Sequence, residues 1–310
     1  MATVDATVSQ PRRRRPGLTE RRLAALMVAP SLVVICLVAA YPIGYAIWLS
    51  LNEYSVRVPG LSRFAGFKNY HEALTSSEFW NSVKNTFVFT GISVSLELLI
   101  GLAMALAMHE AFRGRGLLRT VVLVPWAILT VVTAMTWRTI FEPDLGFANT
   151  VLRTLHLPGG HVVWLGQSPY AMAAMIFADV WKTAPFIALL LLAGLQVIPE
   201  EVYDAAKVDG ANAWQRFLRI TLPLLRPAIL VALLFRTLDA LRVFDLPFVL
   251  TQGANGTETI SLQAQQVLTN DRIIGLGSAL SVLTFVIVML VSFAYIYFVG
   301  GNIRALAEDQ

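Results

Sequence analysis

The chain has 310 residues, of which 56% are hydrophobic and only 14% are charged. Soluble domains carry roughly 25% charged residues, so this composition excludes an ordinary soluble protein and indicates an integral membrane protein. The formal net charge of +4 would also fit a nucleic-acid partner. We expect no nucleic-acid partner, because membrane topology explains where the basic residues lie.

Six apolar stretches are long enough to cross a membrane, for which a helix needs roughly 20 residues. The first, Leu23 to Leu51, follows a basic tail at residues 1–22. A signal peptide has the same order, but its apolar part has only roughly 7–15 residues, so we predict a retained first span. The sequence therefore predicts an all-α, polytopic membrane protein with six transmembrane helices. The other five spans are expected at about residues 83–108, 120–140, 170–198, 224–246 and 273–303.

The lysine and arginine residues outside the spans form two unequal groups. Fourteen lie in the two tails, in the turn at 109–119 and in the stretch at 204–226, whereas six lie in the other three loops. Basic residues collect on the cytoplasmic side of membrane proteins, so we predict that both termini are cytoplasmic. The predicted parts are a basic tail, a first helix with its outer loop, a core and a C-terminal tail, at residues 1–22, 23–80, 81–300 and 301–310.

The most polar long interruption in the second half of the chain runs from Asp204 to Pro223. The pattern predicts two short helices joined at Asp209 and Gly210, because glycine tolerates a sharp bend that most residues resist. Small side chains at Ala205 and the next position would let another surface approach closely. We call residues 200–223 the elbow and predict that it is a docking surface.

The elbow contains an AA pair, two residues, DGA, eight residues and I-x-L-P. This pattern resembles the EAA loop of ABC-importer permeases, with Asp204 where that family usually has glutamate. The resemblance implies the fold of a type I importer permease and a role for the elbow in contacting an ATPase. It assigns this ATPase-coupling role to Asp204, Ala205, Ala206, Asp209, Gly210, Ala211, Leu222 and Pro223.

Charged residues also occur inside two of the predicted spans, where each costs about 2.5–3.5 kcal/mol if it faces lipid. The two spans flank the elbow and run in opposite directions, so their charges should meet at the same depth. They would either form interhelical ion pairs or line a polar cavity for a hydroxyl-rich solute. A further carboxylate, Glu97, is expected to pair with Arg236 or Arg242. On each of the two spans, four residues share one helical face at the spacing i, i+3, i+4, i+7. They are Asp179, Lys182, Thr183 and Phe186 on the fourth span, and Arg236, Asp239, Ala240 and Val243 on the fifth.

The chain also resembles the maltose-type permeases when the two are aligned on W-x-x-x-P at Trp181 and on L-T-x-G at Leu250, and this alignment includes both faces. The resemblance implies that seven of the eight residues, all but Asp179, contact substrate. The chain departs from that pattern by carrying charges where the maltose permease has neutral or small residues, which leaves the sugar open. The segments W-K-T-x-P-F and F-R-T-L-D also resemble trehalose importers of actinobacteria.

No G-x-x-x-x-G-K-[ST] motif occurs, so we expect no cofactor in this chain, with ATP and Mg²⁺ bound by partner subunits. The resemblance implies a bacterial cell-membrane permease that imports a sugar, such as trehalose or maltose, and is not itself an enzyme. Its implied partners are a second permease, two ATPases, an extracytoplasmic solute-binding lipoprotein and membrane lipid. An ion-coupled transporter, with a proton on Glu97 or Asp179, and an intramembrane lipid-modifying enzyme remain the alternatives.

Overall fold

The computed structural model describes residues 20–56, 60, 62–110, 114–158 and 161–308. The chain separates into two units, Met1–Trp48 and Leu49–Gln310. Most of the predicted basic tail, 1–22, and the last two residues of the predicted C-terminal tail lie outside the described residues.

The first unit holds most of helix α1, Glu20–Ser50, which keeps its helical form across Pro30 and Pro42. Tyr41, Tyr45 and Trp48 stack successively along it, with ring centroids 6.2 and 6.1 Å apart. Aromatic rings of this kind are enriched where a span meets the membrane surface. The helix therefore has both the length and the flanking chemistry of the predicted first span.

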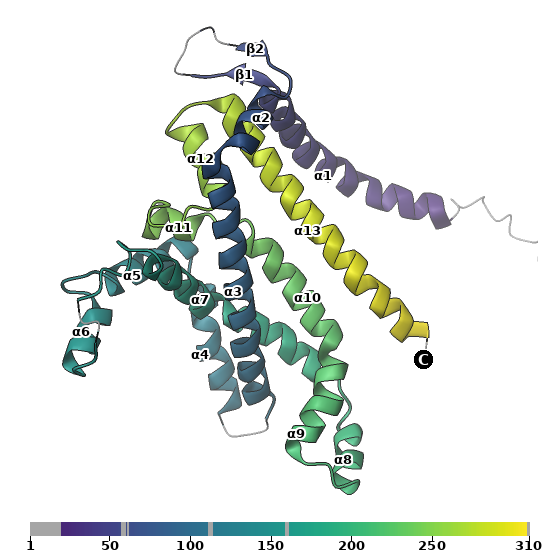
Figure 1. Cartoon of the computed structure of the whole chain (residues 1–310). Helices are drawn as coiled ribbons and strands as arrows, with labels where there is room; N and C mark the ends of the chain where they lie inside the picture. The colour runs from purple at the N-terminus through teal and green to yellow at the C-terminus, as the bar shows by residue number, and fades with distance from the viewer. Residues whose placement is uncertain (1–19, 57–59, 61, 111–113, 159–160, 309–310) are drawn as a thin grey trace, which may run out of the picture. The chain divides into compact units, whose positions relative to one another are not determined.

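Among the described residues, five helices are long and apolar enough to cross a membrane, or six if one bent pair counts as a single span. In the second unit these are α3 (Ser77–His109), α7 (Tyr170–Leu195), α13 (Ile274–Glu308) and the continuous helical stretch Ala213–Ala240. Figure 1 shows α3, α4 and α7 side by side, with α10 and α13 crossing the bundle next to them. The prediction of an α-helical membrane protein is confirmed.

The predicted third span, 120–140, is wrong in one respect, because it is not a single helix. It consists of α4 (Arg115–Ala127) and α5 (Thr130–Ile140), which meet at an angle of 90°. Ile128 and Leu129 separate them in extended conformation, with ψ of 138° and 137°. Pro125 contributes to the break, since proline has no N–H group for the helical ladder.

The predicted fifth span, 224–246, both begins and ends too late. Its helix starts with α9 (Ala213–Arg216), continues through the π-helix η1 (Phe217–Thr221) and ends with α10 (Leu222–Ala240). A turn and the short helix α11 (Asp245–Leu250) follow. Arg242 and Asp245 therefore lie beyond the span rather than inside it.

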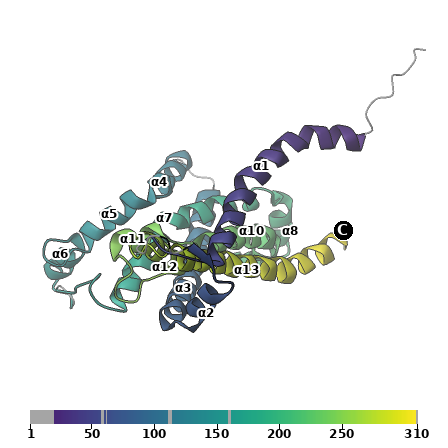
Figure 2. The same cartoon turned by 90° about the horizontal axis from the view of Figure 1, so that it is seen from above.

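The loops carry more structure than the sequence indicated. Residues 52–80 contain an antiparallel pair of short strands, β1 (Asn52–Tyr54) and β2 (Ser62–Phe64), followed by α2 (Lys68–Thr75). The small β-hairpin is a departure from the all-α prediction, and Glu53 stabilises it through ion pairs with Arg63 (2.7 Å) and Lys68 (3.0 Å). The remaining loop helices are α6 (Phe147–Thr154) and α12 (Ile260–Thr269), and α6 lies far from α13 in both views (Figures 1 and 2).

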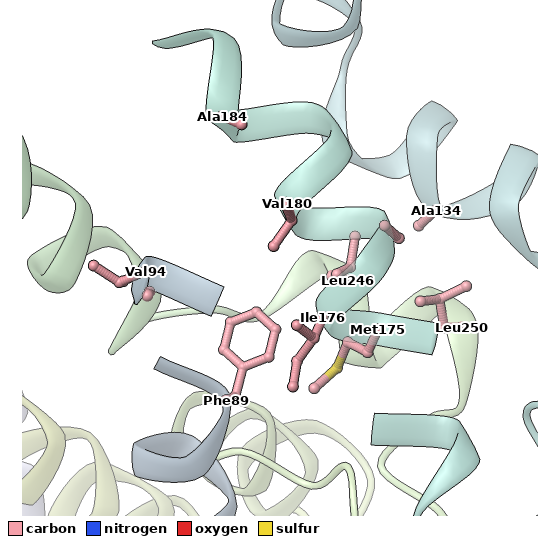
Figure 3. Close-up of a cluster of buried hydrophobic side chains, with 11 residues drawn as sticks. Phe89, Val94, Ala134, Met175, Ile176, Val180, Ala184, Leu246 and Leu250 are labelled. Carbon is pink, nitrogen blue, oxygen red and sulfur yellow. The ribbon is translucent and has the colours of Figure 1, made fainter. Parts of the chain in front are cut away.

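The core of the second unit is built on the close approach of α3 to α7. A side chain at Gly101 would place its Cβ 2.8 Å from Cγ2 of Ile187, so only glycine allows this spacing. At one end of the contact, Phe89 of α3 packs with Met175 and Ile176 of α7 and with Leu246 of α11 (Figure 3). This packing brings the charged turns of α3, α7 and α10 together.

Candidate functional site

Arg236 of α10 is the centre of a buried ion cluster, which we define as Glu97, Asp179, Arg236 and Asp239. Its guanidinium holds the carboxylate of Glu97 on α3 with two hydrogen bonds, Nε to Oε2 at 2.5 Å and Nη2 to Oε1 at 2.9 Å. Nη2 also pairs with Asp179 of α7, and Nη1 pairs with Asp239 at 3.0 Å. The expected pairing of Glu97 is therefore with Arg236, and the cluster joins α3, α7 and α10.

The cluster is an electrostatically demanding arrangement. Arg236 is 3% exposed and Glu97 is not exposed at all, so neither group is solvated by water. Arginine suits this position because its planar fork carries five N–H donors and stays charged. The hydroxyl of Thr183 lies 2.6 Å from Oε1 of Glu97 and supplies one more polar contact to the buried carboxylate.

Beside the cluster lies a polar cavity of about 210 Å³. The side chain of Asp239 is 71% exposed, in contrast to the buried Arg236 that holds it. Asp239 therefore presents an accessible carboxylate, fixed in place by a buried cation, to whatever enters. The lining residues are Trp126, Thr130, Asp179, Lys182, Thr183, Arg236, Asp239, Arg242, Val243, Phe244, Asp245 and Leu246.

Six of the eight predicted substrate residues line this cavity, and two do not. Phe186 instead stacks on Trp126 with ring centroids 5.6 Å apart, and Ala240 is buried in the apolar core. Val243 lines the cavity from the turn after α10 rather than from a continuous helix, because α10 ends at Ala240. The helical spacing therefore predicted correctly that most of these residues share one surface, although α10 ends about one turn before Val243.

Sequence reasoning missed six of the lining residues. Arg242 and Asp245 were visible as charges in the predicted fifth span, but Arg242 was considered only as a partner of Glu97 and Asp245 was given no role. Phe244 precedes α11 and Leu246 lies in its first turn, and no pattern in the sequence distinguished this segment from the predicted span. Trp126 and Thr130 come from the two sides of the α4–α5 break, and nothing in the apolar sequence around them indicates that they face a polar cavity.

The elbow has the two-helix form that the sequence predicts. Helix α8 (Glu200–Val208) and helix α9 are joined through Gly210, whose φ of +78° favours glycine. Asn212 and Gln215 form a capping box at the start of α9, with two hydrogen bonds of 2.9 Å. The elbow is therefore a preformed structure and not a flexible link.

The predicted coupling residues occupy the outside of this elbow. No residue of α8 is buried, and Asp204, Ala205, Asp209 and Gly210 are all exposed. Ala206 and Ala211 are half-buried, whereas Leu222 and Pro223 begin α10 and are partly covered. In Figure 1, α8 and α9 form one end of the second unit, away from α11 and α12.

Residues 97–301 match the family of binding-protein-dependent transport system inner membrane components. The chain belongs to this family. It is 44% identical over 92% of its length to the trehalose transport system permease protein SugA of Mycobacterium tuberculosis, covering 91% of that protein. It is 45% identical over 92% of its length to the trehalose/maltose transport system permease protein MalF of Thermococcus litoralis, covering 95% of that protein.

A third relative, the sulfoquinovosyl glycerol transport system permease protein SmoG of Agrobacterium fabrum, is 37% identical over 90% of this chain and 91% of its own. The fold matches that of a bacterial alginate ABC transporter in complex with alginate pentasaccharide-bound periplasmic protein. That match has a TM-score of 0.77 over 89% of this chain and 93% of the other, at 24% identity. The protein is thus a multi-pass inner-membrane permease subunit with the ABC importer fold.

The permease also has a larger groove, of about 670 Å³, between α3, α4 and α7. None of its lining residues is charged. A sugar needs hydrogen-bond partners for its hydroxyl groups, so this groove suits hydrocarbon, and the smaller polar cavity is the better candidate for a translocated sugar.

Proposed function

We propose that this permease forms one half of the path through which an ABC importer moves a sugar into the cytoplasm, with trehalose and maltose as the first candidates. The observation that carries the proposal is the polar cavity beside the ion cluster, where Asp239 offers an accessible carboxylate. Carboxylates and hydroxyl groups at fixed positions suit the hydroxyl groups of a sugar. The names of SugA and MalF, relatives at 44% and 45% identity, support trehalose and maltose.

The volume of the cavity supports a shared site. Small-molecule sites have volumes of roughly 300–1,000 Å³, and this cavity has about 210 Å³. We infer that a second, homologous permease supplies the opposite wall. An extracytoplasmic solute-binding lipoprotein would deliver the sugar, and membrane lipid would surround the pair.

The elbow would dock on one of two ABC ATPase subunits, which bind ATP and Mg²⁺, while the permease itself catalyses no reaction. Its exposed small residues, Ala205 above all, allow close approach, and Gly210 sets the angle between its two helices. ATP can drive the transport cycle only if it favours one state of the permease through contacts that differ between the states. In this proposal the elbow and both termini lie in the cytoplasm.

The experiment that tests the proposal begins with co-purification of the tagged permease from its native membrane. We expect a second six-span permease and an ABC ATPase to accompany it. The purified complex, reconstituted in liposomes with its binding protein, should accumulate labelled trehalose or maltose when ATP is supplied. A permease that purifies without an ATPase in several mild detergents would contradict the proposal.

The same liposomes separate the importer from an ion-coupled transporter. Uptake should continue in the presence of an uncoupler and should stop without ATP. The ion-coupled alternative has less support, because both carboxylate oxygens of Glu97 accept hydrogen bonds from Arg236. Replacement of Asp239 by Asn should weaken uptake more than assembly, and unchanged uptake kinetics would remove Asp239 from the site.

A further inference from the structure

The break in the third span leaves backbone carbonyl groups that no helix can satisfy. We call the two extended residues Ile128 and Leu129, together with the last turn of α4, the corner. At this point α4 ends and α5 begins at an angle of 90° (Figure 1). The last carbonyls of any helix lack intrahelical partners, and non-helical backbone at membrane depth is tolerated only where protein or a cavity satisfies it.

Four backbone carbonyl groups of the corner accept hydrogen bonds. The carbonyl of Pro125 accepts from the N–H of Ile128 at 3.4 Å, and that of Leu129 accepts from Thr133 at 3.0 Å. The carbonyls of Trp126 and Ile128 both accept from Nζ of Lys182 on α7, at 3.3 and 2.8 Å. One ammonium group therefore satisfies two carbonyls of the corner.

Lys182 makes these contacts from a buried position. Its side chain is largely buried, with 9% of the residue exposed. Unlike Arg236, it forms no direct ion pair with a carboxylate among the described residues. A lysine has three N–H donors, and a positive charge at the C-terminal end of a helix is favourable, so the end of α4 is a suitable partner for this cation.

Aromatic contacts hold both sides of the corner against α7. Phe186, four residues after Lys182, stacks on Trp126 of α4 at an interplanar angle of 14°. Trp181, the residue before Lys182, contacts Trp137 of α5 with ring centroids 5.7 Å apart. Lys182 thus lies between the contact with α4 and the contact with α5.

We propose that Lys182 is a positioning residue that fixes the corner as one wall of the polar cavity. Trp126 and Thr130, one from each side of the corner, both line that cavity. This role differs from the direct sugar contact that the sequence resemblance implies for Lys182, since two of its three donors are already used by the backbone. The importance of this wall for uptake rests on the proposed function, whereas the geometry of the corner does not.

The test measures the corner directly in the assembled transporter. Leu117 of α4 and Thr139 of α5 are both exposed and would be replaced by spin-labelled cysteines, with Cys36 replaced by serine. A rise of 1.5 Å per residue and a 90° corner place the two backbone sites roughly 22 Å apart, against roughly 33 Å for a straight helix. Pulsed electron paramagnetic resonance resolves this range without any sugar present.

We expect a narrow distance distribution in the parent transporter. Lys182→Met should broaden it and shift it toward longer distances, and Lys182→Arg, which keeps a cation with several donors, should restore it. The matched control is Asp239→Asn on the same cavity, which should leave the distribution narrow. If Lys182→Met fails to assemble, the neutral donor in Lys182→Gln should give an intermediate width.

Uptake provides the second measurement. Removal of the two hydrogen bonds to the backbone carbonyls of Trp126 and Ile128 should lower sugar uptake by Lys182→Met about tenfold, with recovery in Lys182→Arg. An unchanged narrow distribution in an assembled Lys182→Met or Lys182→Gln transporter would overturn the proposal, whatever the uptake. If the distribution broadens and neither trehalose nor maltose is transported by the parent protein, the positioning role stands and the proposed substrate fails.

Discussion

The ion cluster predicts a large and specific effect of one substitution, Arg236→Met. Methionine fills a volume similar to that of the arginine stem, but it leaves Glu97 and Asp179 without their cation. Removal of one partner of a buried ion pair costs about 3–5 kcal/mol, because the remaining charge stays buried and uncompensated. The third partner, Asp239, has a side chain that is 71% exposed. The loss of its ion pair with Arg236 therefore adds at most about 1 kcal/mol.

This cost is a large share of the stability of a folded protein, which is typically about 5–15 kcal/mol. We therefore expect Arg236→Met to lower the midpoint of thermal unfolding of the purified complex by roughly 10 °C. The matched control is Arg242→Met, six residues further along the chain and beyond the end of α10. Arg242 is exposed and donates to the carbonyl of Leu238 at 3.0 Å, so this variant should unfold within about 0.5 kcal/mol of the parent.

A second substitution separates the loss of an ion pair from a general packing defect. Replacement of both Arg236 and Glu97 by Met removes the bidentate ion pair as a whole, and only the buried carboxylate of Asp179 is left without its cation. Replacing a buried ion pair by apolar residues of similar volume is often neutral or stabilising, so the double variant should regain at least about 2 kcal/mol relative to Arg236→Met. Equal unfolding midpoints for Arg236→Met and Arg242→Met would refute the reasoning, as would a double variant less stable than Arg236→Met.

Three further predictions concern other parts of the permease. Gly210→Val should uncouple ATP hydrolysis from uptake, because a β-branched residue at φ +78° costs about 1–3 kcal/mol. Gly210→Asn is the control and should retain coupling. Normal coupling in the valine variant would exclude the elbow as the coupling element. Gly101→Ala should destabilise the contact of α3 with α7 by about 1–3 kcal/mol. The control is Gly91→Ala on the same helix, which should leave stability unchanged because an added Cβ there has no atom within 4 Å. Equal unfolding midpoints for these two variants would argue against close packing at Gly101. Burial, together with the charge of Glu78, raises the pKa of Glu258, so its carboxylate opposes folding once the pH exceeds the ordinary carboxyl range. Glu258→Gln should therefore be more stable than the parent at pH 7 and equal to it near pH 4, and a stability difference that is the same at both pH values would disprove this.

The elbow could be predicted in detail because its structure is determined locally. A turn that needs positive φ at Gly210, and an asparagine three residues before Gln215, specify their conformation without distant contacts. The same local character makes the motif visible as a family signature. The coupling role of its residues still depends on a partner and remains a prediction.

The ion cluster could be predicted only in outline. The cost of charges in the membrane requires Asp179 and Arg236 to find partners, and their equal depth brings them together. The choice between Arg236 and Arg242 for Glu97 could not be made from sequence, because it depends on where α10 ends. With the helix ending at Ala240, Arg242 turns away, and only Arg236 reaches α3.

The corner is the part of the site that sequence reasoning could not find. Its surroundings are uniformly apolar, and Pro125 is the single local signal, which is weak because membrane helices tolerate proline. The two carbonyls that make the break tolerable are satisfied by Lys182, which lies 54 and 56 residues further along the chain. From sequence alone, the charge of Lys182 requires a partner. The sequence predicted a carboxylate or a sugar for this role. The structure supplies a backbone instead, and a lysine that serves as a helix cap cannot be distinguished from a ligand-binding lysine until the break that it caps is known.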